Sequence, residues 1–240
     1  MTTEMQQRSF NGDTPRIINV NKHHMACLFL LDTSGSMAVT NESGTRPIDE
    51  LVKALNRFKT EVCKDPTTQA ILDVAIVEFN TNVRVVQEFV PVTEMETVSL
   101  EAQGGTSMSE GLRTALDMVM ERGRLYAKFC VPYCPWIVMI TDGYPSDSID
   151  DIAEEILRLD QMDKLRLWSL AVEGADIRLL MELGHGKRVL ILRDYDFTKF
   201  FDWVNKSMRS ISVSSPGERP RGENLPANVD LVKEISDDLM

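Results

Sequence analysis

The sequence lacks an excess of basic residues, and this absence excludes two classes of partner. Lysine and arginine number 26 against 37 aspartates and glutamates, so the formal net charge is −11. Proteins that bind nucleic acids or anionic membranes without specificity need a basic surface. We therefore expect neither nucleic acid nor a membrane as a partner.

Long apolar runs are also missing. The longest, residues 25–31, is far shorter than the roughly 20 residues that a membrane-spanning helix needs. Residues 1–24 are polar, with charged side chains such as Glu4 and Arg16, so they lack the apolar core of a signal peptide. We predict a polar N-terminal extension over residues 1–24 and a cytoplasmic location.

Cysteine and histidine are scarce. Cys130 and Cys134 have a C-x3-C spacing, but no second Cys or His pair lies nearby to complete a four-ligand zinc site. A disulfide between them is the other alternative, which a reducing cytosol disfavours. His185 is the only histidine outside the N-terminal segment and is expected in a loop rather than as a catalytic base. His23 and His24 precede the first predicted strand and are expected to be exposed.

Strand and helix patterns, in contrast, alternate along most of the chain. Continuous apolar runs are typical of buried strands, and apolar residues three or four apart are typical of helices. We predict strands over Met25–Asp32, Leu72–Phe79 and residues 83–90, 136–140, 165–172 and 189–192. Helices are predicted over residues 48–62, 108–119, 149–159, 177–183 and 198–211.

This alternation predicts an α/β fold with a doubly wound, mostly parallel central sheet and helices on both faces. A turn at residues 80–82 joins two strands into a hairpin, which adds one antiparallel edge strand. We assign one domain to residues 25–213. Residues 214–240 open with SSPGERPRGENLP, a linker composition, and are predicted to form a flexible tail. A short helix over residues 229–239 is the alternative.

Three short polar motifs stand next to these elements. DTSGS at residues 32–36 follows the first strand, TDG at residues 141–143 follows a later strand, and GGTS at residues 104–107 precedes a helix. Ligands of open α/β sheets bind outside the carboxyl ends of the strands, where the strand order reverses. If the two strands are neighbours there, the three motifs meet at one point.

The motifs would bring together five oxygen-bearing side chains: Asp32, Ser34, Ser36, Thr106 and Asp142. Hard oxygen ligands suit Mg²⁺, Mn²⁺ or Ca²⁺ rather than zinc or copper. Two carboxylates balance one divalent charge, and neutral hydroxyls donate little electron density, so the ion would accept a further oxygen ligand. The alternative is that both aspartates are caps or turn residues and that the serines fill a tight turn.

The motif D-x-S-x-S, followed by Thr106 and by the TDG motif, resembles the metal-ion-dependent adhesion site of von Willebrand factor A domains, over residues 25–211. Within that superfamily, the chain resembles the bacterial tellurite-resistance group of TerY-like proteins in overall size and sequence character. The resemblance implies that Ser34, Ser36 and Thr106 coordinate Mg²⁺ through their hydroxyls. Asp32 and Asp142 would act largely through water, and a partner's Asp or Glu carboxylate would fill the open position.

We therefore expect an interaction module of a tellurite-resistance or stress-response system, and not an enzyme. A Mg²⁺-dependent phosphoester enzyme would use the same ion as a Lewis acid. Against it, the sequence has no second metal cluster, no GxxxxGK[ST] loop and no GxSxG motif. A third alternative is a structural module in which the metal only ties loops together.

Overall fold

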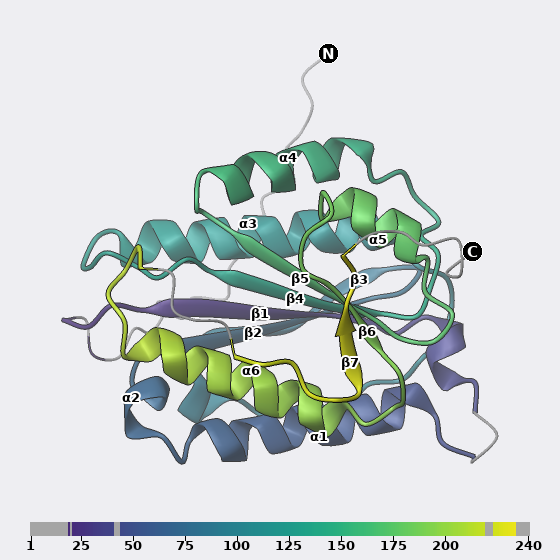
Figure 1. Ribbon diagram of the computed structural model, residues 1–240, viewed down its shortest axis with the longest axis horizontal. Helices are drawn as coiled ribbons and strands as arrows, with labels where there is room; N and C mark the ends of the chain where they lie inside the picture. The colour runs from purple at the N-terminus through teal and green to yellow at the C-terminus, as the bar shows by residue number, and fades with distance from the viewer. Residues whose placement is uncertain (1–18, 20, 41–43, 219–222, 234–240) are drawn as a thin grey trace.

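Three apolar runs form the centre of a seven-stranded sheet in the computed structural model, which describes residues 19, 21–40, 44–218 and 223–233 (Figure 1). The strand order is β3-β2-β1-β4-β5-β6-β7. The strands are β1 (Met25–Asp32), β2 (Leu72–Phe79), β3 (Val83–Pro91), β4 (Trp136–Thr141), β5 (Arg166–Ala171), β6 (Val189–Leu192) and β7 (Val229–Leu231).

Helices cover both faces of the sheet. One face carries α1 (Pro47–Val62), the short α2 (Pro66–Gln69) and α6 (Phe197–Ser212), and the other carries α3 (Met108–Tyr126), α4 (Asp150–Gln161) and α5 (Ile177–Leu183) (Figure 1). Short 3₁₀ turns lie at Gly35–Ala38 (η1) and Val92–Glu94 (η2). No helix of the described residues is long and apolar enough to cross a membrane.

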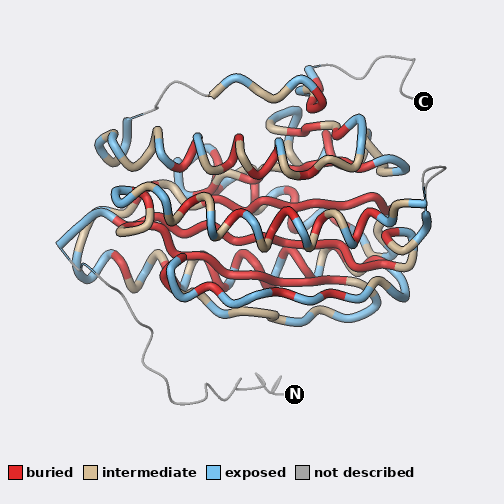
Figure 2. Tube along the Cα trace, turned by 90° about the horizontal axis from the view of Figure 1, so that it is seen from below, coloured by how far each residue is buried: buried red, intermediate tan, exposed pale blue. Residues whose placement is uncertain are grey.

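The sheet is buried on both sides, which explains why its central strands are continuously apolar (Figure 2). Side chains alternate along β1, so Phe29 packs on the side of α1 and α6, whereas Leu28 and Leu30 pack on the side of α3. Trp136 and Trp168 join Trp203 of α6 in an aromatic cluster, with ring centroids 4.9–6.1 Å apart. The three tryptophans therefore pack in or against the core.

The predicted fold class is confirmed. β1 pairs in parallel with β2 and β4, β4 with β5, and β5 with β6, while β3 pairs antiparallel with β2 at one edge. The chain leaves β1 toward β2 and β3 and returns to β4 on the other side of β1. The strand order therefore reverses between β1 and β4, where the strand ends with DTSGS and TDG lie next to each other.

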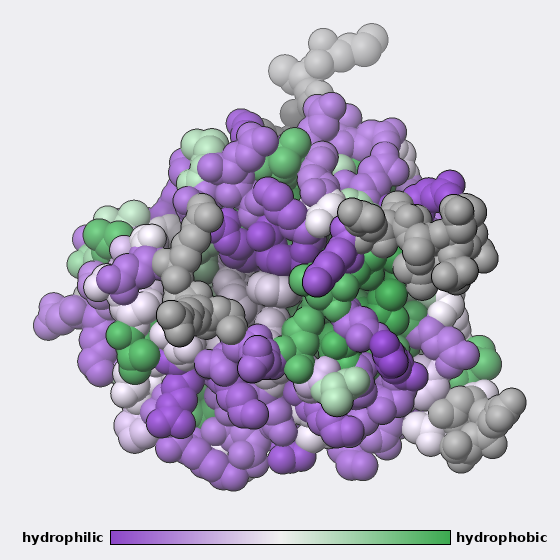
Figure 3. All heavy atoms as spheres, viewed as in Figure 1, coloured by the Kyte–Doolittle hydropathy of each residue, from purple (hydrophilic) through white to green (hydrophobic). Residues whose placement is uncertain are grey.

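Part of the segment predicted as a flexible tail extends the sheet instead. β7 pairs antiparallel with β6, and Val229 and Val232 are buried. A helix is wrong over Val229–Leu231, because β6 offers unpaired backbone groups that an extended segment can satisfy. In Figure 3 hydrophobic side chains gather around this edge, framed by hydrophilic ones. Residues 234–240, and residues 1–18 of the predicted N-terminal extension, lie outside the described part.

A buried ionic cluster lies at the opposite end of the sheet, near the starts of β1 and β2. Arg122 Nη2 donates to Asp73 Oδ2 at 2.7 Å, and the Tyr126 hydroxyl donates to the same oxygen at 2.5 Å. The expectation that His24 is exposed was wrong: it is 1% exposed, and its ring stacks on Tyr126 at 5.2 Å. The reason is that α3 reaches this end of the sheet and covers the segment before β1.

Candidate metal site

The carboxylate of Asp32 is fixed at the end of β1 by two hydrogen bonds. The β1–β4 register pairs Leu31 with Ile140, so the next residues, Asp32 and Thr141, lie side by side. The Thr141 hydroxyl donates to Asp32 Oδ2 at 2.6 Å, and the Ser34 backbone N–H donates to Oδ1 at 2.8 Å. The side chain is fully buried, so its orientation is set by β4 and by the loop that follows β1.

A chain of hydroxyls links the two motifs. Ser34 Oγ lies 3.0 Å from Ser36 Oγ, and Ser36 Oγ donates to Asp142 Oδ1 at 2.8 Å. Ser36 is the second residue of η1, the turn that carries the chain away from β1. The structure thus brings both serines to the aspartate that follows β4, as the spacing of the motifs predicts.

Glycines bring Thr106 to the same place. Gly104 has a φ of +76°, and its carbonyl accepts a hydrogen bond from Gly35 N–H at 3.0 Å, which joins the loop before α3 to the loop after β1. Gly143 leaves space between two of the predicted ligands. A Cβ at this position would lie 3.0 Å from Thr106 Oγ1 and 3.2 Å from Asp32 Oδ2. All five predicted site residues therefore converge.

The electrostatics of the cluster favour a cation. Burial raises the pKa of Asp142 to about 6, the hydrogen bond from Ser36 opposes this rise, and the negative charge of Asp32 adds to it. Burial also raises the pKa of Asp32, against hydrogen bonds from Ser34 and Thr141 that lower it. Two neighbouring carboxylates that are both costly to ionise would be stabilised in their charged forms by a divalent ion.

The chemistry of the donor set narrows the choice of ion. Among the described residues no three His, Cys, Asp or Glu side chains are grouped so that they could hold a metal. A cation here would depend on three hydroxyls, two carboxylates and water. This all-oxygen set fits Mg²⁺, Mn²⁺ or Ca²⁺ and offers nothing to soft metals.

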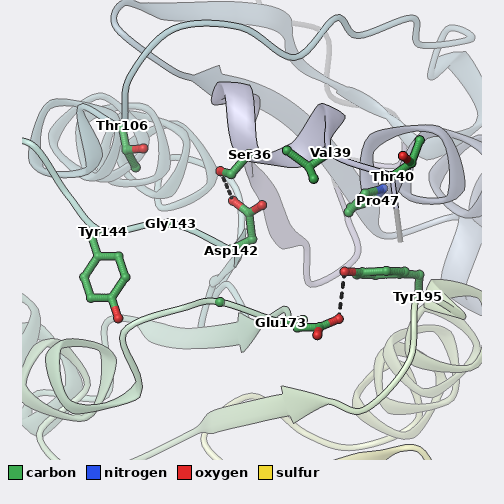
Figure 4. Close-up of a pocket in the computed structure, with 11 residues that line it drawn as sticks. Ser36, Val39, Thr40, Pro47, Thr106, Asp142, Gly143, Tyr144, Glu173 and Tyr195 are labelled. Carbon is green, nitrogen blue, oxygen red and sulfur yellow. Dashed lines mark hydrogen bonds between the residues drawn. The ribbon is translucent and has the colours of Figure 1, made fainter. Parts of the chain in front are cut away.

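A pocket of about 870 Å³ opens beside the cluster (Figure 4). Its lining comes from several loops and helix ends: Ser36, Val39, Thr40, Pro47, Thr106, Asp142, Gly143, Tyr144, Glu173, Gly174 and Tyr195. The Tyr195 hydroxyl donates to Glu173 Oε2 at 2.9 Å. Burial and this hydrogen bond raise the pKa of Tyr195 to about 12, so the hydroxyl remains a donor.

Sequence reasoning gave Thr141 of the TDG motif no role and missed Glu173 and Tyr195 as parts of this region. Thr141 is the last residue of β4, Glu173 lies two residues after β5, and Tyr195 lies three residues after β6. All three occupy the carboxyl ends of parallel strands, the rule that identified Asp32. Applying that rule to every strand would have placed Glu173 and Tyr195 at this edge of the sheet, although not in one pocket with Asp142.

Comparison with known proteins supports the fold. The family model of the von Willebrand factor type A domain matches residues 27–205. A search of curated proteins finds no match. Three similar solved structures are a point mutant of the PilB minor pilin from Streptococcus sanguinis, a von Willebrand factor type A protein from Catenulispora acidiphila, and the pilus adhesin SpaC from Lactobacillus rhamnosus GG.

These three likenesses are distant in sequence. The TM-scores are 0.58, 0.60 and 0.64, at 16%, 16% and 14% identity, and cover 81%, 78% and 80% of this chain. The matches span 64%, 43% and 31% of the three solved chains, so each of those chains is considerably longer than the part it shares. Since the family model covers most of the chain, this chain belongs to the von Willebrand factor type A domain family.

Proposed function

We propose that this domain is a protein-interaction module that holds one divalent ion, Mg²⁺ by preference, and uses it to bind a carboxylate of a partner. The observation that carries the proposal is the convergence of Asp32, Ser34, Ser36, Thr106 and Asp142 at the β1/β4 switch point. Ser34, Ser36 and Thr106 would coordinate the ion directly, and the two aspartates directly or through water.

The ion would accept a further oxygen ligand, and the residues of this chain determine how strongly it does so. Three of the five side chains are neutral hydroxyls, which donate little electron density, so an incoming Asp or Glu adds a strong charged ligand. The ion also offsets the repulsion that a net charge of −11 would exert on an acidic partner. The adjoining pocket gives a partner segment access to this position.

The first prediction concerns the metal itself. Isothermal titration calorimetry should find one Mg²⁺ site per chain, and Asp142→Asn should abolish it because the substitution removes one of two carboxylates. Asp117→Asn is the matched control, since this aspartate is exposed on α3, away from the pocket. Unchanged Mg²⁺ binding in Asp142→Asn would remove the site assignment.

Partner binding is tested by capture from cell lysate with Mg²⁺ or with a chelator. We expect capture only with the ion, and loss of capture in Ser34→Ala, which deletes one hydroxyl ligand. If Ser34→Ala weakens the metal site and leaves capture unchanged, the partner uses another face. A purely structural ion would then be the better assignment.

We further propose that the module has no catalytic activity and works in the cytoplasm, in a tellurite-resistance or stress-response system. The support for this cellular role is the resemblance in overall size and sequence character to TerY-like proteins. As for catalysis, His185 Nε2 is hydrogen-bonded to the Ala153 carbonyl at 3.0 Å, and His185 is not among the pocket's lining residues. Growth of a deletion strain on tellurite tests the role in resistance, and unchanged growth would contradict it.

A further inference from the structure

The pocket beside the metal site has an acidic wall. Its lining residues include Asp142 and Glu173 and no Lys, Arg or His. A divalent ion would balance Asp32 and Asp142, whereas Glu173 is exposed and receives its hydrogen bond from the neutral hydroxyl of Tyr195. No ion pair joins Glu173 to another described residue. A negative charge therefore remains in the pocket after the metal is bound.

One tyrosine contacts this charge, and a second lies elsewhere in the pocket lining. In Figure 4 the Tyr195 hydroxyl points to Glu173, whereas Tyr144 lies at the far side of the pocket. Tyr144 is 67% exposed and lines the pocket, so its ring is accessible to a bound segment. A carboxylate beside a tyrosine ring, in a pocket with a second exposed ring, is suited to an ammonium or guanidinium group, through charge and cation–π attraction.

We propose that the partner segment carries a basic residue, lysine or arginine, within about three residues of the acidic residue that reaches the metal, and that Glu173 binds it beside Tyr195. This inference rests on the proposed function. The pocket volume of about 870 Å³ is sufficient for two such side chains. A wholly acidic segment would be repelled by Glu173, so this residue selects among acidic partners instead of adding to metal binding.

The experiment selects random peptides displayed on phage against the Mg²⁺-loaded protein and elutes them with EDTA. We expect the eluted peptides to contain Asp or Glu, with Lys or Arg enriched within three residues of it. Selection on Glu173→Gln should retain the acidic residue and lose the basic enrichment. Glu173→Arg should replace the basic enrichment with a second acidic one.

Glu154→Gln is the matched control. This glutamate is exposed on α4 and lies outside the pocket lining, so its neutralisation should leave the selected sequences unchanged. The best peptide from the wild-type selection should bind Glu173→Gln about two- to fivefold more weakly, as expected for one exposed ion pair. The Mg²⁺ affinity of Glu173→Gln, measured by calorimetry without peptide, should equal that of the wild type.

Four results would overturn the inference. Basic enrichment that persists in Glu173→Gln would show that another group binds the cation. Weaker Mg²⁺ binding, or tighter peptide binding, in Glu173→Gln would mean that Glu173 itself occupies the ion. EDTA-eluted peptides without an acidic residue would contradict the proposed function, and the inference with it. Acidic enrichment without basic enrichment contradicts the inference alone.

Discussion

Gly104 shapes the candidate site because its position has no room for a side chain. Its φ is +76°, and a Cβ there would lie 2.4 Å from Thr81 Oγ1. That threonine oxygen also accepts a hydrogen bond from Gly105 N–H at 2.8 Å. Any side chain at Gly104 would therefore push the loop before Thr106 away from the hydroxyl that holds it.

Gly104→Ala should lower the free energy of unfolding by about 1–3 kcal/mol, because a side chain is strained at this φ and meets Thr81. It should also weaken Mg²⁺ binding through displacement of Thr106. Gly105→Ala is the control, since a Cβ there meets Thr81 Oγ1 at an ordinary 3.7 Å. Urea unfolding and calorimetry test both variants, and equal effects of the two substitutions would contradict this account.

At the scale of residues, the sequence was sufficient where a motif marks a strand end. Asp32 and Asp142 follow continuous apolar runs, so their place at the edge of the sheet follows from the strands alone. Glu173 and Tyr195 stand in loops with no recognisable spacing, and only the tertiary arrangement shows that they share a pocket with Asp142. Their roles depend on which loops face each other, which local patterns do not encode.

The carboxylate of Asp160 links the C-terminal end of α4 to the sheet. Asp160 accepts from Arg166 Nη1 and from Lys187 Nζ, each at 3.0 Å, and from Arg188. Burial alone would raise the pKa of Asp160, but the hydrogen bond from Lys187 and the charges of Arg188 and Arg166 outweigh it and leave the pKa lowered. The helix, β5 and the turn before β6 therefore meet at this residue.

Asp160→Asn should reduce the free energy of unfolding at pH 7 by about 2 kcal/mol, since charged hydrogen bonds to a half-buried cluster are lost. A carboxylate whose pKa is lowered by folding stabilises the native state at pH values above its unfolded pKa, which is near 4. This stabilisation is lost as the pH falls through the folded pKa. The difference in free energy of unfolding between wild type and variant, measured by urea titration, should therefore shrink below about pH 4. A gap independent of pH would refute the assignment. Asp163→Asn, at an exposed partner of Arg166, should cost at most about 1 kcal/mol.

β7 makes the C-terminal segment part of the packed structure. Val229 is 4% exposed and packs in the core formed with α1 and α6, whereas Leu231, two residues along the same strand, is 43% exposed. The Trp203 Nε1–H donates to the Glu223 carbonyl at 3.0 Å, which holds the approach to β7 against α6. This segment therefore contributes to the stability of the domain.

Val229→Ala should lower the free energy of unfolding by about 2 kcal/mol, because it removes buried methyl groups and leaves a cavity. Leu231→Ala is the control and should change it by less than about 0.5 kcal/mol. Thermal unfolding of the two variants decides the matter. Equal midpoints would show that the strand contributes nothing in solution.

At the scale of elements, prediction from sequence depended on length and hydrophobicity. β1 and β2 are eight-residue, mostly apolar segments, and the predicted bounds of both were confirmed residue for residue. β7 has three residues with Asp230 in the middle, so it carries no strand pattern of its own. Its conformation is imposed by the open edge of β6, which is a property of the assembled sheet.

Across the whole molecule, the two ends of the sheet carry polar clusters that differ in how their charges are balanced. At the carboxyl ends of β1 and β4, two aspartates and three hydroxyls come together with no cationic side chain among the pocket's lining residues. At the other end, Asp73 is matched by Arg122, with Tyr126 and His24 beside it. Asp73 pairs in register with Ala26, and six residues of strand separate that position from Asp32, about 20 Å.

This separation predicts that folding stability and metal binding can be lost independently. Asp73→Asn should lower the free energy of unfolding by about 3–5 kcal/mol, because it leaves the buried Arg122 charge without its carboxylate. The Mg²⁺ affinity of the folded variant should remain that of the wild type.

Asp142→Asn should do the reverse: Mg²⁺ binding is lost, while the metal-free protein unfolds at the same temperature or a higher one. The raised pKa of Asp142 gives the reason, since burial disfavours the charge that the substitution removes. Calorimetry and thermal unfolding of both variants, with and without Mg²⁺, provide the test. Loss of Mg²⁺ binding in folded Asp73→Asn would show that the two ends of the sheet are coupled.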